Sequence, residues 1–413
     1  MENRYSSFVT LSLDLPLFPG VQRGRMLRMA VAAQRHSKSY LFESLERCGM
    51  TARKKKGGGR KSRDVTLKMV AEHVGLTKGT CSAVLNKTVA SRSIPLRTRE
   101  RILAAARELN YRPSFYARNL GVKRTYMIGV ATLEIGDFYS SPIIAGIERY
   151  LRQKNFFFLT VPHRHDPKLL ETYSQILLDR GVEGFIAVDI SIDRPLPLPT
   201  VAIPGHSRVK GVTNIVLDHR RAAWLALNHL IELGHTEIAF MKGAEVSPDC
   251  EDRWKAIREV AEELGIRMRS DLIVQLEGDD PTPQLGYPFA KQLLSRKRPF
   301  TALFAYNDIS AIGSIRAFQD AGLQVPKDIS VVGFDDIRIA VHNNPSLTTV
   351  RQPLQKMGEI AARALLDRIE RHGDGTTEIA IEPEFVVRSS TDRVTAQPTA
   401  ARNHQYAPAR ARG

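Results

Sequence analysis

Residues 65–86 read VTLKMVAEHVGLTKGTCSAVLN and predict two short helices joined by a tight turn. Thr66 suits an N-cap, and the apolar residues after it fall on one helical face. Gly75 can take the left-handed conformation that ends a helix, and Thr77 can cap a second helix. Such a pair forms a helix-turn-helix, whose second helix enters the DNA major groove. The alternative is an ordinary helical hairpin inside a core.

The residues that follow favour the DNA-binding interpretation. Pro95 suits the first turn of a third amphipathic helix, RTRERILAAARELN. Residues 110–121, NYRPSFYARNLG, come next. This segment is too short to hold as a helix in water, because nucleation costs more than a few hydrogen bonds return.

The order of these motifs resembles the lac repressor (LacI) family of bacterial transcription regulators. VTLKMVA, LTKGTCSAVLN and LNYRPSFYARNL carry the resemblance at its start. LGHTEIAFMKG, TALFAYNDISAIGSIRAFQDAGLQVPKDISVVGFDD and LTTVRQPLQKMGEIAARALLDRI continue it, so that it covers residues 65–390. The resemblance implies a helix-turn-helix domain, a hinge helix that orders on DNA, and a two-lobed effector domain like periplasmic binding proteins.

Side chains near the start of the recognition helix read bases. Lys78 can donate to guanine or to a phosphate, and Thr80 and Ser82 can reach either. The family commonly carries an arginine where this chain has Ala83, and Gly79 weakens the helix by ~1 kcal/mol relative to alanine. We therefore expect less direct base readout and more reliance on the hinge and on DNA shape. The residues expected to contact DNA are Thr66, Thr77, Lys78, Gly79, Thr80, Ser82, Ala83, Asn86, Tyr111, Ala117 and Leu120.

Leu120 matches the leucine that the family's hinge helix pushes into the minor groove. An apolar wedge of this kind unstacks a base step, and the resulting bend permits further contacts. The alternative is that Leu120 is merely a linker residue.

Composition sets the broad class. The 413 residues exceed what one core usually serves, so two or three domains are expected. The net charge of +16 suggests a polyanionic partner, although it also fits a merely soluble basic protein. Three distant cysteines indicate a reducing compartment and match no metal-ligand spacing. With no run of 18 apolar residues and no signal-peptide pattern, we expect a cytoplasmic, nucleoid-associated protein without membrane contact, cofactor or metal.

From residue 126 onward, near-continuous apolar strands alternate with amphipathic helices. This pattern predicts parallel sheets covered on both faces, in two α/β lobes. We expect the chain to cross between the lobes more than once, first near residues 218–221 and again near residues 347–353.

Candidate effector contacts stand at strand ends, where open α/β sheets bind ligands. Asn307 and Asp308 follow TALFAY, Asp335 follows ISVVGF, and Arg253 opens the helix after EIAFMKG. Amide, carboxylate and guanidinium groups together suit a polyol or sugar. By motif position, Arg253, Asn307 and Asp335 match family effector contacts, and Tyr139 matches an aromatic lining residue.

Two observations limit what can be expected of the effector contacts and of the ligand. Asp308 or Asp336 could instead cap the following helix. Pro204 and Gly205 stand where many relatives carry a ligand-binding carboxylate, so an ordinary hexose is less assured. His163 and His165 are interpreted as loop residues rather than ligands.

The expected organisation has five parts. They are a disordered extension with a basic arm (1–64), the helix-turn-helix domain (65–112), a hinge helix and linker (113–125), the two-lobed effector-binding and dimerisation domain (126–390), and a disordered tail (391–413). In the family the helix-turn-helix lies close to the N-terminus, so the 49 residues that precede Met50 depart from the family pattern. Translation could start at Met50, which we favour, or the extension could bind a partner.

The function expected from these features is a ligand-responsive, sequence-specific transcription regulator, and more specifically a repressor. It would bind a near-palindromic operator as a homodimer, with a sugar or related small polar metabolite as effector. The lobes alone would also fit a solute-binding transport component, but the helix-turn-helix counts against it. A sugar-processing enzyme is disfavoured, since the sequence shows no nucleophile elbow, Gly-rich phosphate loop or metal-ligand cluster.

Overall fold

The computed structural model describes residues 65–111, 124–206, 209–278, 280–371 and 378–394. The chain forms two compact units that divide after residue 113. The expected extension and nearly all of the hinge, including Ala117 and Leu120, lie outside the described residues, as does most of the expected tail. Among the described helices, none is long and apolar enough to cross a membrane.

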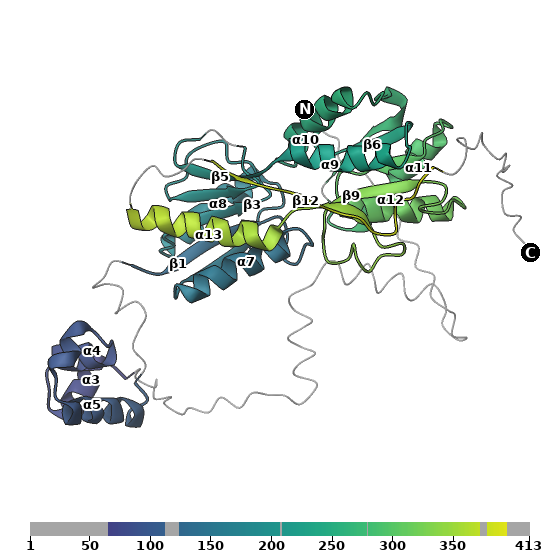
Figure 1. Ribbon diagram of the computed structural model, residues 1–413. Helices are drawn as coiled ribbons and strands as arrows, with labels where there is room; N and C mark the ends of the chain where they lie inside the picture. Colours follow the sequence, from purple (N-terminus) through teal and green to yellow (C-terminus); the bar gives the residue numbers. More distant parts are fainter. Residues whose placement is uncertain (1–64, 112–123, 207–208, 279, 372–377, 395–413) are drawn as a thin grey trace, which may run out of the picture. The chain divides into compact units, whose positions relative to one another are not determined.

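The first unit is a small helical domain (Figure 1). Its elements are α3 (Leu67–Val74), α4 (Lys78–Leu85), the 3-10 helix η1 (Val89–Ser93) and α5 (Leu96–Glu108). Thr66 and Thr77 cap α3 and α4 by accepting hydrogen bonds from the backbone amides of Met69 and Thr80. Gly75 ends α3 with a φ of 65°, the left-handed conformation expected from the sequence.

One apolar cluster holds this unit together. Val70, Cys81 and Ile102, one from each α-helix, have no exposed surface. Burying such side chains contributes roughly 1.5–3 kcal/mol each, which a domain of this size needs. Arg101 adds a cross-link, since its guanidinium donates to the carbonyl of Val74 at 2.6 Å.

The second unit contains two six-stranded sheets, one in each lobe. The first lobe has strand order β11-β5-β4-β3-β1-β2 and the second has β12-β10-β9-β8-β6-β7. Every pairing is parallel except that between β12 and β10. The strands are β1 (Met127–Thr132), β2 (Phe157–Pro162), β3 (Gly184–Val188), β4 (Thr200–Ile203), β5 (Val212–Leu217), β6 (Ile238–Lys242), β7 (Ile273–Gln275), β8 (Ala302–Phe304), β9 (Ser330–Asp335), β10 (Thr348–Arg351), β11 (Glu378–Ile381) and β12 (Glu384–Val386).

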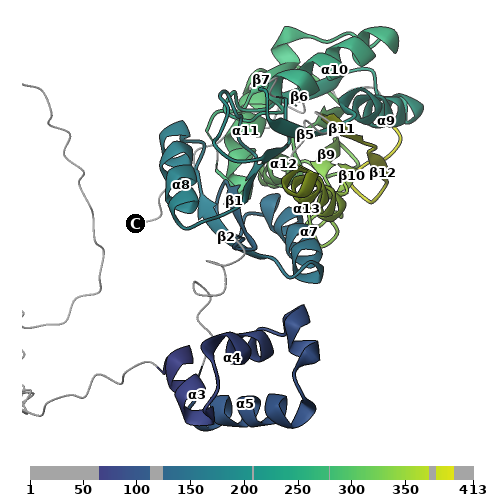
Figure 2. The ribbon, with the colours of Figure 1, turned by 90° about the vertical axis from the view of Figure 1, so that its left-hand side faces the viewer.

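Helices cover both faces of each sheet. They are α7 (Ser140–Gln153), α8 (Pro167–Asp179) and α13 (Leu354–Arg371) in the first lobe, and α9 (His219–Glu232), α10 (Cys250–Glu263), α11 (Tyr287–Ser295) and α12 (Asp308–Asp320), with the 3-10 helices η2 (Ser270–Leu272) and η3 (Pro283–Leu285), in the second. Figure 2 shows α8 on one side of β1, and α7 and α13 on the other. Alternate strand residues serve the two faces: in β6, Phe240 joins the core beneath α9 and α10, and Met241 joins the core beneath α11 and α12.

The chain passes between the lobes three times. It leaves the first lobe after β5 at Asp218, returns between β10 and α13, and leaves again between β11 and β12. The first two passages lie where the sequence predicted them, and the third was not predicted. Segments that follow the carboxyl ends of strands in both lobes line one space between the lobes.

Candidate functional site

The recognition helix α4 has one buried face and one open face. Cys81 and Val84 lie in the core of the helical domain. Lys78 and Gly79 are exposed, and Ser82 is partly exposed. Because Lys78 is exposed at the first position of the helix, its side chain is free to meet a DNA groove.

Short polar contacts orient the other expected DNA-binding residues. The Thr77 and Thr80 hydroxyls lie 2.9 Å apart, and the Asn86 side-chain amide donates to the Ser82 hydroxyl at 3.0 Å. Thr66 is exposed beside the start of α3. Ala83 is half-buried and Tyr111 packs against the core of the domain, so Tyr111 presents less surface to DNA than its motif position suggested.

The second site is a cleft between the two lobes. It encloses about 810 Å³, open solvent at its mouth included. Its polar lining comes from the segments after strands in both lobes, as expected for open parallel sheets. Polar side chains that line the cleft include those of Asp137, Tyr139, His165, Asp189, Asp249, Arg253, Tyr306, Asn307 and Asp335. All four effector contacts expected from the sequence line this one cleft; whether they touch a ligand stays a prediction.

Arg253 is more firmly held than the sequence suggested. It is the fourth residue of α10 rather than its first, and only 4% of its surface is exposed. Its guanidinium pairs with Asp249 at 2.8 Å, donates to the carbonyl of Tyr306 at 2.8 Å, and lies 3.8 Å from the Phe334 ring centroid. The Arg253 Nε has no hydrogen-bond partner among the described residues. Arg253 therefore stabilises the second lobe as well as lining the cleft.

Asn307 caps α12 through a capping box with Ser310. The idea that Asp308 or Asp336 caps the following helix is wrong for both residues. Asp308 is fully buried and accepts hydrogen bonds from the Thr349 hydroxyl and the Ile337 amide.

Asp336 is held by two arginines instead of a helix terminus. Its carboxylate pairs with Arg351 at 2.7 Å and with Arg388 at 2.6 Å. Both Asp308 and Asp336 are thus committed to structural contacts, which leaves Asp335 as the carboxylate of this segment that faces the cleft.

The Asp335 carboxyl has a perturbed pKa. Burial raises this pKa to about 7, although the positive charge of Arg253 and a hydrogen bond from Gln352 at 2.7 Å lower it. Burial also raises the pKa of Asp189. A carboxyl poised in this way can donate or accept a hydrogen bond near neutral pH.

Tyr139 contributes an unpaired polar atom. Its hydroxyl is buried and has no hydrogen-bond partner among the described residues, and burial raises its pKa well above the ordinary value. The neighbouring Asp137 accepts hydrogen bonds from the backbone amides of Tyr139 and Ser140. The start of α7 is thereby fixed against the cleft.

Sequence reasoning missed several cleft residues. Asp137, Asp189 and Asp249 were not singled out, and His165 was interpreted as a loop residue. His165 lies in a loop, but it also lines the cleft, and its Nε2 is 3.5 Å from the Asp189 carboxylate. Position after a strand was the available signal, since each of the segments carrying Asp137, His165 and Asp189 follows one.

Comparison with known proteins places the chain. Residues 66–114 match the family described as bacterial regulatory proteins, lacI family, and residues 227–391 match the periplasmic binding protein-like domain. The HTH-type transcriptional repressor PurR of Yersinia pestis is 31% identical over 79% of this chain and 96% of its own length. The PurR repressor of Haemophilus influenzae is 31% identical over 80% of this chain and 99% of its own.

The chain belongs to the lacI family. A lac repressor dimer bound to operator and an anti-inducer matches with a TM-score of 0.71 and 27% identity, over 80% of this chain and 100% of that one. A CelR–cellobiose complex matches with a TM-score of 0.57 and 27% identity, over 79% and 99%. A LacI-family regulator from Enterococcus faecium with bound ribose matches with a TM-score of 0.57 and 28% identity, over 65% and 99%.

Membership in the lacI family decides between the classes that the sequence left open. The chain is a DNA-binding transcriptional repressor with an effector-binding domain, rather than an enzyme. A solute-binding transport component would need the lobes alone, whereas this chain carries the helix-turn-helix in addition.

Proposed function

We propose that this LacI-family repressor binds a near-palindromic operator as a homodimer and responds to a sugar or related small polar metabolite. The observation that carries the proposal is the polar lining of the interlobe cleft. Buried polar groups in proteins are normally paired. The Tyr139 hydroxyl and the Arg253 Nε are buried without hydrogen-bond partners among the described residues, and a ligand rich in hydroxyls would complete both.

The chemistry of the lining supports a polyhydroxy ligand. Carboxylates of Asp189 and Asp335 can accept hydrogen bonds from hydroxyls, and aromatic rings of Tyr139 and Tyr306 can cover an apolar ring face. Two related regulators were solved with cellobiose and with ribose, which are ligands of this class.

Response to the ligand follows from the position of the cleft. A ligand held there touches residues of both lobes, so its affinity differs between lobe arrangements. A ligand shifts a conformational equilibrium only by this difference in affinity. The arrangement that it favours would set the affinity of the attached helix-turn-helix for DNA.

Two arguments support a homodimer: the two half-sites of a near-palindrome and the exposed apolar surface of β2. Two recognition helices are needed to read both halves of a near-palindrome. The edge strand β2 carries Phe157, which is 71% exposed, and Leu159, which is 37% exposed, on the same side of the strand. Exposed apolar side chains side by side on an edge strand are typical of a surface that another subunit covers.

A ligand screen tests the effector class. The purified chain is heated with cellobiose, ribose, common hexoses or nucleobases, and any compound that raises Tm is added to a fluorescence-anisotropy assay on duplexes enriched from genomic fragments. We expect at least one sugar to raise Tm and to change duplex affinity. Asp335→Asn should lose this response, whereas Asp367→Asn, an exposed carboxylate on α13, should keep it.

Two results would contradict the proposal. If only nucleobases shift Tm and duplex affinity, the effector class is wrong. If sugars bind but leave duplex affinity unchanged at saturation, the cleft does not control DNA binding.

A further inference from the structure

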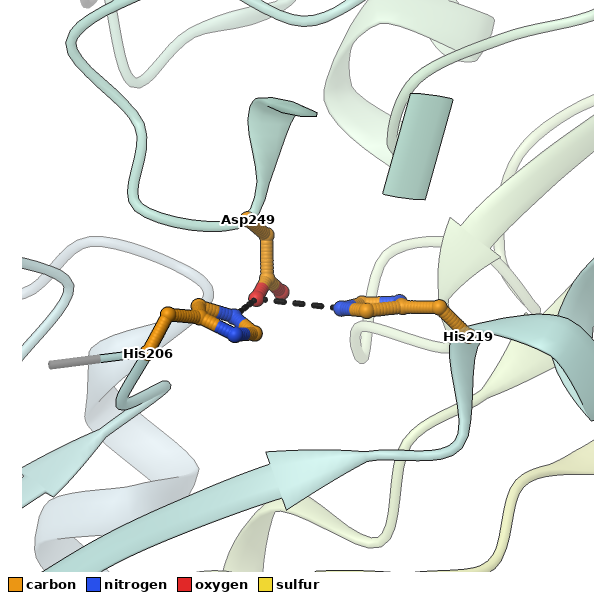
Figure 3. A group of neighbouring side chains, drawn as sticks. All are labelled: His206, His219 and Asp249. Atoms are coloured by element: carbon orange, nitrogen blue, oxygen red, sulfur yellow. Dashed lines mark hydrogen bonds and ion pairs between the residues drawn. The ribbon is translucent and has the colours of Figure 1, made fainter. Parts of the chain in front are cut away.

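Two histidines and an aspartate converge at the first passage between the lobes. His206 follows β4 in the first lobe, His219 is the first residue of α9, and Asp249 precedes α10 in the second lobe. Figure 3 shows the Asp249 carboxylate between the two imidazoles. These residues lie far apart along the chain, which is why the sequence predicted no metal-ligand cluster.

Both histidines approach the same carboxylate oxygen of Asp249. Asp249 Oδ1 lies 2.6 Å from His206 Nε2 and 3.1 Å from His219 Nε2. The other oxygen, Oδ2, is occupied by Arg253 at 2.8 Å. The carboxylate is thus divided, with one oxygen on the guanidinium and the other aimed at both histidines.

His219 is the unexplained member of the group. It is 7% exposed, and neither of its ring nitrogens makes a hydrogen bond with the described residues. The 3.1 Å contact of its Nε2 with Asp249 is within ion-pair distance but outside hydrogen-bond geometry. A buried imidazole without hydrogen bonds is costly, unless a further atom completes the site.

His206 is already oriented as metal ligands usually are. Its Nδ1 lies 2.9 Å from the Asp252 carboxylate, and its Nε2 points to Asp249. A histidine that binds a metal almost always gives its other ring nitrogen to a carboxylate or carbonyl, which fixes the tautomer. Asp252 supplies that outer contact here.

We propose that His206, His219 and Asp249 bind a divalent transition-metal cation such as Zn²⁺ between the two lobes. Two imidazole nitrogens, one carboxylate oxygen and an open fourth position form a recognised zinc donor set. The three donor atoms all lie within 4.8 Å of one another.

The two nitrogen–oxygen separations are close to those of a zinc site. Tetrahedral zinc with bonds near 2.0–2.1 Å separates its ligand atoms by about 3.3 Å. The two nitrogens are now 2.6 and 3.1 Å from Asp249 Oδ1, so each must move outward by less than an ångström. Without a metal, the His206 Nε2–H donates a hydrogen bond to Asp249 Oδ1, and the metal would displace this proton.

An ion at this position would affect how the two lobes are arranged. His206 belongs to the first lobe, Asp249 to the second, and His219 to the passage between them. An ion bound by all three favours the lobe arrangement in which these ligands meet. Asp249 also lines the cleft, so the fourth position is within reach of that space.

Metal titration of the full-length, untagged chain tests the proposal. After chelator treatment and dialysis, ZnCl₂ binding is measured by calorimetry, and Co²⁺ is added to record the visible spectrum. We expect one equivalent of zinc to bind and to raise Tm, and cobalt to give the visible absorption of a tetrahedral site. His206→Gln and His219→Gln should each lose this binding.

Matched variants separate the site from surface histidines and from misfolding. His342→Gln removes an exposed histidine, and His165→Gln removes a histidine that lines the cleft; both should bind zinc as the parent does. Asp252→Asn, which removes the negative charge of the outer contact to His206, should weaken zinc binding about 10–100-fold without changing Tm in the metal-free state.

Two outcomes would overturn the proposal. The first is a parent chain that binds no zinc, in which case the group is a proton-linked ion pair. The second is zinc binding that persists unchanged in both His206→Gln and His219→Gln. Circular dichroism of these variants shows whether they fold, and the Co²⁺ spectrum of Asp252→Asn tests the site even where they do not.

Discussion

At the scale of single residues, Asp335 shows how the cleft is prepared for a ligand. It ends β9 with a φ of 111°, is 5% exposed, and accepts a hydrogen bond from Gln352. Burial raises the pKa of its carboxyl from 3.8 to about 7. The folded state therefore holds a proton that the unfolded chain releases between these two pH values, so the contribution of Asp335 to stability falls as pH rises through this window.

The first prediction is that Asp335→Asn stabilises the protein at pH 8. The amide cannot ionise, keeps an acceptor for Gln352, and tolerates positive φ. We expect a gain of roughly 1–3 kcal/mol in the free energy of unfolding at pH 8, shrinking toward zero near pH 4. Urea unfolding of both proteins at several pH values measures the difference. A difference that does not vary with pH would mean that Asp335 titrates normally.

At the scale of elements, helical glycines differ in how closely their neighbours approach. A Cβ on Gly146 of α7 would collide with the backbone of Gln355, and one on Gly358 of α13 would collide with the backbone of Ile143. These two glycines let α7 and α13 pack backbone against backbone over the sheet of the first lobe (Figure 2). By contrast, a Cβ on Gly79 of the recognition helix would meet only the Thr77 hydroxyl, at 3.7 Å, which is an ordinary van der Waals contact.

The second prediction uses this contrast. Gly358→Ala should destabilise the effector domain by about 1–3 kcal/mol, because the added methyl group forces the helices apart. Gly79→Ala should stabilise the helix-turn-helix domain by up to about 1 kcal/mol, because it removes only the helix penalty of glycine. Thermal unfolding followed by circular dichroism measures both. A Gly358→Ala protein as stable as the parent would contradict the close contact of α7 and α13, and a destabilised Gly79→Ala protein would contradict the space at α4.

The third prediction concerns Lys78 on α4. Lys78→Ala should weaken binding to an enriched duplex by about 1–3 kcal/mol if the side chain reads a base. Lys291→Ala, which removes the same charge from the exposed side of α11, serves as the control. Anisotropy titrations at fixed salt give the comparison. Equal losses on specific and random duplexes would make Lys78 a phosphate contact instead.

At the scale of the whole molecule, the expected dimer depends on the surface of β2. Phe157 lies on β2, the edge strand of its sheet, and most of its side chain is exposed. A charge placed there would have to be desolvated on assembly, which opposes association.

The fourth prediction is therefore that Phe157→Glu yields a monomer and weakens operator binding. Loss of one half-site contact follows from loss of the partner, since each subunit carries one recognition helix. Val387→Glu, at an exposed valine in the second lobe, should leave the dimer intact. Sedimentation of both variants measures their mass. A dimeric Phe157→Glu protein would place the interface elsewhere.

Much of this architecture was predictable because its signals are local. The caps Thr66 and Thr77, the left-handed Gly75 and the apolar runs of β1, β3 and β9 each act within a few residues of sequence. The strands β5, β10, β11 and β12 were not singled out. The last three are only three or four residues long, and the polar residues Thr213 and Asn214 interrupt β5.

The site was predictable only in part. Arg253 and Asp335 were found from motif position, but the pairing of Arg253 with Asp249 depends on the turn before α10. The meeting of His206, His219 and Asp249 depends on the passage between lobes, which joins segments that no local pattern relates.

Sequence-specific binding of DNA is the property that a LacI-family repressor must have, and enrichment from genomic DNA measures it. The full-length protein is used to enrich fragments from genomic DNA, and its Kd for the enriched duplex is compared with that for random duplex at the same salt concentration. We predict a near-palindromic enriched sequence bound about 10³-fold or more tightly than random duplex. No enriched sequence, and a ratio of affinities close to one, would contradict the claim.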